Sequence, residues 1–226
     1  MKNHLKRIAS PRTWAIDRKN NKFITRPRPG AHSFENGLAL GVIIRDHLKL
    51  ASTMSEVKKT LNNNEVLVDG KRRKDHRYLI GLFDVLKIAK KSYRIIFDRK
   101  GRIIVTEISE KESQIKPCKI LGKTVLGKNK IQFNLHDGKN IIVKTDAKVG
   151  DTLLLKVPQL EIIETLPLKK GVTVFLTKGK HSGDVGLFKE IKKGEAIYSK
   201  GKEEIETAKE YLFVIGKEKA LLEIKN

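Results

Sequence analysis

The chain has few of the features that would direct it to a particular chemistry. Its 226 residues include one cysteine, Cys118, which excludes an internal disulfide and is typical of a reducing compartment. The six histidines are scattered, and none lies at metal-ligand spacing from a cysteine or another histidine, so we predict no metal site and no cofactor. No apolar run approaches the roughly 20 residues that cross a bilayer. Residues 1–10 also lack the apolar core of a signal peptide, so we expect a soluble protein.

Acidic residues are scarce, and arginine is confined to the first half of the chain. Forty-eight Lys and Arg against 26 Asp and Glu give a net charge of +22, which repels itself unless a polyanion neutralises it. All 12 arginines lie between Arg7 and Arg102. Because a guanidinium matches phosphate and stacks on bases, we expect fixed nucleic-acid contacts to concentrate there, although drift in composition explains the pattern equally well. An anionic membrane is the weaker alternative, since no single amphipathic helix carries the charge.

Residues 38–88 contain the most informative pattern. Apolar residues at helical spacing predict helices over 38–50 and 53–61. The second starts at a capping box made by Thr53 and Glu56, and three asparagines at 62–64 mark its end. The spacing of the first helix turns Arg45 and Lys49 outward together.

A strand is predicted over 65–68, and Asp69-Gly70 is the strongest turn signal in the chain. Five of the seven residues over 71–77 are cationic, and a second strand covers 84–88. The cationic turn and the helix faces together predict a basic surface for several phosphates; the alternative is a solvated loop whose charges serve solubility.

This order of elements, with the Val68-Asp69-Gly70-Lys71 turn and the sequence DVLKI over 84–88, resembles the alpha-L RNA-binding domain. That domain occurs in ribosomal proteins, pseudouridine synthases and some tRNA synthetases. The resemblance implies RNA binding but no particular protein.

Residues 1–37 are predicted to be an extended arm that is disordered alone and orders along RNA. Nine basic residues precede position 31 with one acid, Asp17, and three prolines break any long helix. Trp14 and Phe23 either stack on a base or pack on the body of the protein, and for Trp14 packing is favoured.

The arm also resembles a known family. Residues 4–7 (HLKR), 10–14 (SPRTW) and 26–32 (RPRPGAH), continuing into the first helix, are similar to the family of small-subunit ribosomal proteins numbered four in the e-type (archaeal and eukaryotic) series. Two departures, Ala39 where the family has proline and Gly41 within the helix, leave the start of that helix open. The closing residues 213–217 (FVIGK) fit the family too, and the shorter chain resembles an archaeal member.

The remainder is predicted to be strand and turn. A hairpin covers 93–97 and 102–108, a linker 109–116, and further strands 131–135, 141–143, 152–157 and 161–166. The run GVTVFLTKGKHSGDVGLFKEI from Gly171 resembles the KOW motif, a barrel segment of ribosomal and elongation proteins. Strands over 172–177, 187–191, 195–199 and 210–215 would close that barrel, and its lysine-bearing loop either reaches RNA or is a purely structural turn.

No enzyme signature is present. Gly179-Lys180 is followed by His181 between strands, which fits neither a dinucleotide fingerprint nor a P-loop. A pseudouridine synthase or tRNA synthetase would need a catalytic domain that nothing here matches. A free-standing translation or elongation regulator remains an alternative.

We therefore predict an α+β protein that is not an enzyme: an arm (1–37), an alpha-L domain with its hairpin (38–108), a central all-β domain (109–168) and a KOW-type SH3-like barrel (169–226). It would be a structural constituent of the small ribosomal subunit in the cytoplasm, with small-subunit rRNA and neighbouring ribosomal proteins as partners and no membrane, small molecule or second copy. The residues predicted to contact RNA are Lys2, His4, Lys6, Arg7, Arg12, Trp14, Arg26, Arg28, Arg45, Lys49, Lys58, Lys71, Arg72, Arg73, Lys74, Arg77, Arg94, Arg99, Arg102, Lys178, Lys180 and His181.

Overall fold

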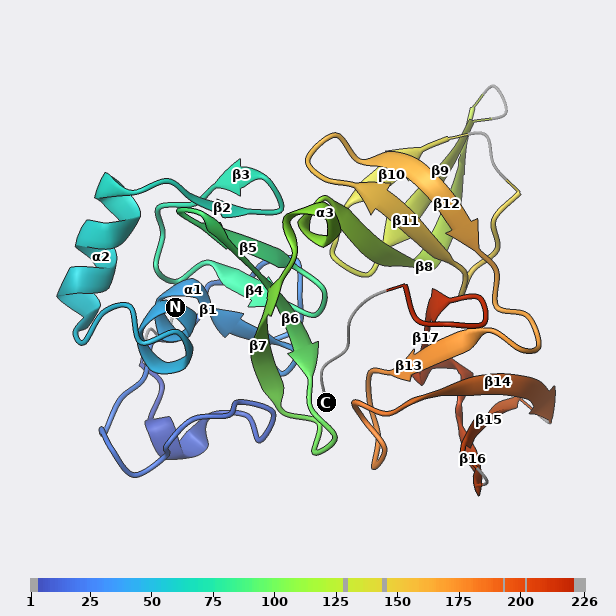
Figure 1. Cartoon of the computed structure of the whole chain (residues 1–226), viewed down its shortest axis with the longest axis horizontal. Coiled ribbons are helices and arrows are strands. Elements are labelled where there is room, and N and C mark those ends of the chain that lie inside the picture. Colours follow the sequence, from blue (N-terminus) through green and yellow to red (C-terminus); the bar gives the residue numbers. More distant parts are fainter. Residues whose placement is uncertain (1–3, 128–129, 144–145, 193, 202, 222–226) are drawn as a thin grey trace. The chain divides into compact units, whose positions relative to one another are not determined.

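A computed structural model describes residues 4–127, 130–143, 146–192, 194–201 and 203–221 (Figure 1). The chain forms two compact units: unit 1 contains Met1–Ile96 and Arg102–Ser113, and unit 2 contains Phe97–Gly101 and Gln114–Asn226. Strands dominate and helices are few, which is consistent with the predicted α+β class. Among the described residues, no helix is both long enough and apolar enough to cross a membrane.

Helical backbone in unit 1 begins later than predicted. Gly37–Ala39 form strand β1, which pairs antiparallel with β4 (Leu79–Gly81), so the prediction of a helix from position 38 is wrong at its start. Helix α1 (Leu40–Val42) runs directly into a π-helical turn, η2 (Ile43–His47). Every residue of β1 and α1 is buried, and a fully buried segment carries no periodicity that separates a strand from a helix.

The second helix is confirmed. Helix α2 (Met54–Asn63) starts after Thr53, whose side chain accepts a hydrogen bond from the Glu56 N–H, while the Glu56 carboxylate accepts from the Thr53 N–H. This capping box satisfies donors that the first turn leaves free. The helix stops at Asn64, whose backbone is extended, as the asparagine run predicted.

The predicted turn at Asp69-Gly70 is also confirmed, although the short strand that follows it was not predicted. Both residues have positive φ, 48° and 71°, the geometry of a tight turn whose twist matches the strands it joins. The turn connects β2 and β3 at the edge of a five-stranded sheet with the order β3-β2-β5-β6-β7. These strands are β2 (Val66–Val68), β3 (Lys71–Arg72), β5 (Val85–Ile88), β6 (Lys91–Phe97) and β7 (Ile103–Ile108).

The N-terminal segment is not the free arm that the sequence predicted. Its described part has one short 3₁₀ helix, η1 (Arg7–Ala9), and otherwise irregular backbone. Arg7, Trp14 and Ile24 are buried, and Trp14 forms an isolated bridge with Ile103 of β7. Charge and proline content predicted disorder, but Trp14 bridges Ile103 and Arg7 pairs with Asp46, so the segment makes its own contacts with the body of unit 1.

Unit 2 begins where a linker was predicted. Helix α3 (Glu110–Ser113) closes unit 1, and strand β8 (Ile115–Leu126) starts immediately afterwards, so the prediction of an irregular linker over 109–116 is wrong. Strand β8 is central in a sheet with the order β10-β9-β8-β11-β12. Its other strands are β9 (Lys130–Leu135), β10 (Asn140–Ile142), β11 (Thr152–Lys156) and β12 (Glu161–Leu166).

The last sheet has the order β16-β15-β14-β13-β17, all pairs antiparallel. Its strands are β13 (Thr173–Leu176), β14 (Val185–Lys192), β15 (Glu195–Lys200), β16 (Glu203–Ala208) and β17 (Leu212–Gly216), with a 3₁₀ helix η3 (Lys209–Tyr211) before β17. Strand β16 was not predicted. It is an exposed edge strand that carries three glutamates, a composition that favours a loop.

Strand β11 joins two cores within unit 2. Leu153 and Leu155 pack into the cluster around Phe133, whereas Leu154, between them, packs into the cluster around Val174 and Tyr198. Alternate side chains of a strand point to opposite faces, so a strand with apolar residues at successive positions can serve a core on each side.

Candidate nucleic-acid interface

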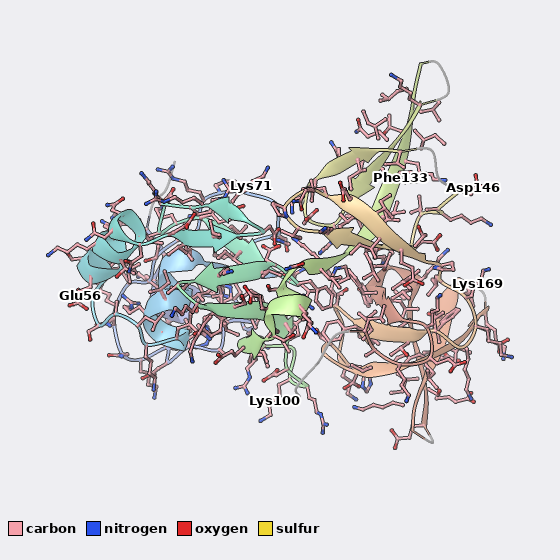
Figure 2. All side chains as sticks on the ribbon, turned by 45° about the horizontal axis from the view of Figure 1, so that its top comes forward. Glu56, Lys71, Lys100, Phe133, Asp146 and Lys169 are labelled. Atoms are coloured by element: carbon pink, nitrogen blue, oxygen red, sulfur yellow. The ribbon has the colours of Figure 1, made fainter. Side chains whose placement is uncertain are left out.

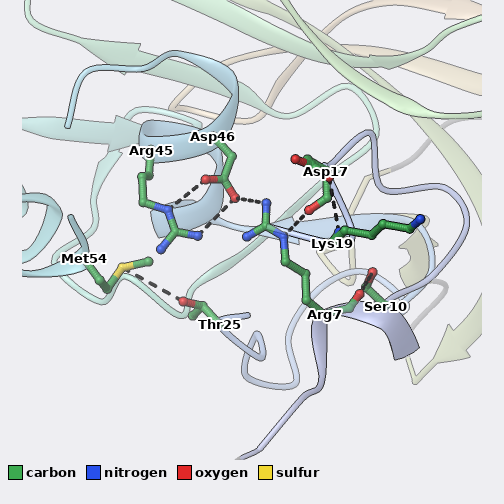
Figure 3. A network of polar contacts seen from close by, with 8 residues as sticks. All are labelled: Arg7, Ser10, Asp17, Lys19, Thr25, Arg45, Asp46 and Met54. Carbon is green, nitrogen blue, oxygen red and sulfur yellow. Dashed lines mark hydrogen bonds and ion pairs between the residues drawn. The ribbon is translucent and has the colours of Figure 1, made fainter. Parts of the chain in front are cut away.

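Arg7 and Arg45 belong to an internal ion-pair network (Figure 3). Arg7 is 3% exposed; its Nε donates to the Asp17 carbonyl, and its Nη2 lies 3.3 Å from Asp46 Oδ2. Arg45 holds the same carboxylate with two donors, at 2.8 and 3.1 Å. Burial would raise the pKa of Asp46, but hydrogen bonding to Arg45 and the charges of Arg45 and Arg7 bring it below its ordinary value. Both arginines were predicted to contact RNA, but Arg7 fastens the N-terminal segment to η2, and Arg45 pairs with Asp46 within η2.

Trp14 is likewise withdrawn from the surface. It is 1% exposed, and its ring centroid lies 5.4 Å from that of Phe34. The carbonyl of the preceding Thr13 accepts a hydrogen bond from the Ile103 N–H at 2.6 Å, which anchors the backbone here. A ring without an accessible face cannot stack on a base, so the favoured packing alternative is confirmed and we correct the inclusion of Trp14 among the contact residues.

Arg94 is the third predicted contact that turns inward. Its side chain is 2% exposed; Nη1 lies 2.8 Å from the Glu112 carboxylate and Nη2 donates to the Glu112 carbonyl at 2.8 Å. Burial lowers the pKa of Arg94 to about 10, against the opposing charges of Glu112 and Asp69. The residue fixes α3 to β6 and does not extend a basic surface.

The cationic hairpin keeps most of its charge outside. Lys71, Arg72 and Lys74 are exposed, and Lys71 lies on the surface of unit 1 beside the hairpin turn (Figure 2). Arg72 Nη2 donates to the carbonyl of Asn62 at 3.1 Å, so its stem crosses the end of α2. Arg73 differs, because its guanidinium lies over the Tyr78 ring at 4.3 Å from the centroid. Three of the four consecutive cations therefore remain available to phosphate.

His76 marks the place where cations from three segments meet. Desolvation lowers its pKa, and the charges of Lys58 on α2, Arg77 beside it and Arg28 of the N-terminal segment lower it further, while Asp75 opposes them. The Arg28 guanidinium lies 3.0 Å from Asp75, and the Arg28 N–H donates to the Arg77 carbonyl at 2.9 Å. Three predicted contact residues far apart in sequence are thus brought together, and we name them the His76 cluster: Arg28, Lys58 and Arg77.

Several other predicted residues have exposed side chains. In unit 1 these are His4, Lys6, Arg12, Lys49 and Arg102, with Arg26 half-buried; Lys2 lies outside the described residues. Sequence reasoning missed Arg18, whose Nη atoms donate to the carbonyls of Ser10 and Pro11, both at 2.7 Å. No local pattern marks an arginine that binds carbonyls of its own segment.

In unit 2, Arg99, Lys178 and Lys180 are exposed. His181 is partly held by Asp184, at 3.4 Å, whose other oxygen lies 2.7 Å from Lys200. This loop returns through Gly183, which has φ of +90° and lies so close to the Asp98 carbonyl that a Cβ would stand 1.9 Å from that oxygen. The glycine is therefore required by packing, and the two exposed lysines before it are the groups that can reach a ligand.

Cys118, His136 and Asp137 form the one group of potential metal ligands among the described residues. Asp137 Oδ2 instead lies 2.9 Å from Lys116 Nζ and 3.0 Å from Lys139 Nζ. Burial would raise the pKa of Asp137, but the charges of Lys116, His136 and Lys139 place it well below its usual range. Two ammonium groups already neutralise this carboxylate, so the donor set does not fit a cation.

Comparison with known proteins gives concordant matches along the chain. A model of the RS4NT (NUC023) domain matches residues 1–35, and a model of the ribosomal family S4e matches residues 89–162. The small ribosomal subunit protein eS4 of Methanocella arvoryzae is 43% identical over 96% of this chain and 95% of its own length. That of Methanocaldococcus jannaschii is 40% identical over 99% of this chain and 98% of its own. The crystal structure of the 30S ribosomal protein S4e from Thermoplasma acidophilum has a TM-score of 0.71 at 30% identity, covering 80% of this chain and 95% of that one.

Proposed function

Since this chain belongs to the ribosomal S4e family, we propose that it is a structural constituent of the small ribosomal subunit that binds folded rRNA and supports assembly and translation. The family is one of ribosomal structural proteins, which confirms the prediction that the chain is not an enzyme. The curated relatives named above are archaeal, as the resemblance of the sequence implied.

The observation that carries rRNA binding is the convergence of the His76 cluster beside an exposed cationic hairpin. Arg28, Lys58 and Arg77 come from three segments, and Lys71, Arg72 and Lys74 stay exposed. Asp75 offsets part of this charge, and the remainder costs free energy unless a polyanion lies against it. Phosphates of a folded RNA meet that need at several points at once, and contacts of this kind position a protein on RNA without reading its sequence.

We propose in the same way that each unit holds a recognisable domain. Helix α2, the β2–β3 hairpin and β5 form the part of unit 1 that resembles an alpha-L domain, and the two sheets of unit 2 are a central domain and a KOW-type barrel. Unit 1 would then be the main rRNA-binding body, and unit 2 would contact rRNA through Lys178 and Lys180. Neighbouring ribosomal proteins are the other partners, and the protein works in the cytoplasm within the ribosome.

Chemical probing of protein-free archaeal small-subunit rRNA, with and without the purified full chain, tests this proposal. We expect a defined set of protected nucleotides that persists when excess tRNA is added, because shape and fixed phosphates distinguish one folded RNA from another. Protection that disappears under tRNA competition would reduce the interaction to non-specific charge and contradict a structural role.

A matched pair of variants locates the binding surface. Replacing Arg28, Lys58 and Arg77 by methionine removes the His76 cluster, whereas replacing Lys189, Lys192 and Lys217 removes the same charge at lysines that are already paired with glutamates. The first variant is expected to lose protections that the second retains. Equal losses would show that binding depends on total charge and not on this cluster.

A further inference from the structure

Phe23 is an aromatic side chain on the surface whose backbone is paired with another part of the chain. It is 49% exposed, although it lies in a segment whose neighbours are tied down. Phe23 forms an antiparallel bridge with Lys6, the Ile24 N–H donates to the Leu5 carbonyl at 3.0 Å, and the Arg7 N–H donates to the Lys22 carbonyl at 3.0 Å. The backbone that carries the ring is therefore fixed by hydrogen bonds on either side of it.

The pairing also decides which residues surround the ring. Residues directly opposite in an antiparallel bridge project to the same side, so Lys6 lies on the side of Phe23. Arg7 and Ile24, which follow these two residues along the chain, are buried. The His4 ring stands edge-on to Phe23 at 5.7 Å between centroids, and the Lys22 ammonium lies 5.6 Å from the ring centroid.

Phe34 differs from Phe23, because a buried aromatic side chain packs against its ring. It is 37% exposed, but Trp14 packs against it and the Arg26 guanidinium lies 6.0 Å from its centroid. The described ring contacts of Phe23 are made instead by two exposed side chains, His4 and Lys22. The Lys22 side chain can turn from the ring to a phosphate when another flat group takes its place.

We propose that Phe23, with His4, Lys6 and Lys22, is a stacking platform for one unpaired base of the rRNA. An exposed ring edged by three basic side chains has the composition of single-strand binding sites, in which the ring stacks on a base and the cations hold the flanking phosphates. Its backbone is held by hydrogen bonds within the protein itself, so little conformational freedom would be given up on binding. This inference rests on the proposed function and adds to it a single-stranded contact away from the phosphate contacts of the His76 cluster.

The test compares full-length Phe23→Leu, Phe23→Trp and Ile8→Ala in rRNA binding and chemical probing. Leucine keeps apolar bulk but removes the π face; tryptophan enlarges that face; Ile8, 73% exposed in the same segment, is the control for loss of apolar surface. Phe23→Leu is expected to weaken binding about tenfold and to lose protection of one or two unpaired nucleotides, with the other protections intact. Phe23→Trp and Ile8→Ala should bind as wild type or, for tryptophan, more tightly.

The outcomes separate this proposal from the one it rests on. If wild type protects no rRNA, both fail. If Phe23→Leu retains every protection and wild-type affinity, the platform alone is overturned. If Phe23→Leu binds naked rRNA normally but dissociates from assembled subunits at lower salt, the ring packs on a neighbouring protein and the platform is again overturned. Thermal unfolding of each variant verifies that the half-exposed position tolerates the change.

Discussion

The two units of this protein place cations in their interiors in different ways. Unit 1 buries arginines, Arg7 and Arg94, each of which binds a carboxylate and a backbone carbonyl at once. Unit 2 buries lysines: Lys116 pairs with Asp137, and Lys119 donates to the carbonyls of Glu210 and Leu212 at 2.6 and 2.7 Å. The arginine-rich half of the sequence is therefore not simply its RNA-binding half, because two of its arginines, Arg7 and Arg94, hold the fold together.

The largest effect should follow deletion of residues 2–30. An arm that is disordered alone, as the sequence predicts for residues 1–37, could be removed without loss of the fold, but the buried positions of Arg7, Trp14 and Ile24 lead us to the opposite expectation. Removal of a buried tryptophan alone costs about 3–5 kcal/mol. We expect unit 1 to lose cooperative unfolding while unit 2 retains it, measured by hydrogen exchange across both. Uniform protection in the truncated chain would restore the free-arm interpretation.

The next largest effect is expected for Arg94→Ala, which leaves the Glu112 carboxylate without its partner. Breaking a buried pair by removing one member costs about 3–5 kcal/mol. Arg12→Ala, at an exposed arginine of the same unit, should change the free energy of unfolding by less than about 0.5 kcal/mol. Chemical denaturation measures both variants. Similar small costs would mean that the buried pair contributes little.

Lys119 gives unit 2 a pH response. Burial lowers its pKa from 10.5 to about 8, so between these values the unfolded chain binds more protons than the folded one. The free energy of unfolding is therefore expected to fall as the pH falls from 10.5 to about 8. Above pH 10.5 this loss is absent, and below about pH 8 it is complete. Lys119→Met should remove this rise from the unfolding free energy, whereas Lys178→Met, at an exposed lysine, should leave it. A Lys119→Met profile parallel to wild type between pH 8 and 10.5 would refute the assignment.

The smallest predicted effect concerns the His76 cluster. Because the charge of Lys58 is the largest charge contribution that lowers the pKa of His76, Lys58→Ala should raise that pKa toward its ordinary value of 6.5. NMR titration of the His76 ring measures the change. Lys49→Ala, at an exposed lysine outside the His76 cluster, is the control. If the pKa of His76 were the same in both variants, the charge of Lys58 would not act on His76, and Lys58 would not belong to the cluster.

Local signals in the sequence predicted local structure well. The capping box of Thr53 and Glu56 and the turn at Asp69-Gly70 each depend on residues within a few positions, and both were confirmed. The start of the first helix was predicted wrongly because β1 is fully buried and pairs with β4, about forty residues away. Strand β16 was missed because an edge strand needs few apolar residues.

The candidate site was predictable in composition but not in arrangement. The family resemblance and the cationic turn could both be recognised in the sequence. Which arginines turn inward depends on partners distant in sequence, such as Asp46 for Arg7 and the Glu112 carbonyl for Arg94. The exposure of Phe23 depends likewise on its pairing with Lys6, which no local pattern reveals.

The salt dependence of rRNA binding by two variants of equal charge decides whether the exposed hairpin cations bind phosphates. The hairpin variant replaces these three exposed cations, Lys71, Arg72 and Lys74, by alanine. The control variant replaces three lysines that are paired with glutamates, Lys189, Lys192 and Lys217, by alanine. Every phosphate that is no longer neutralised should flatten the slope of log affinity against log salt by about 0.7 to 0.9. We predict a decrease of about two to three units for the hairpin variant and no change for the other. Equal slopes in both variants and wild type would show that the hairpin does not bind the RNA.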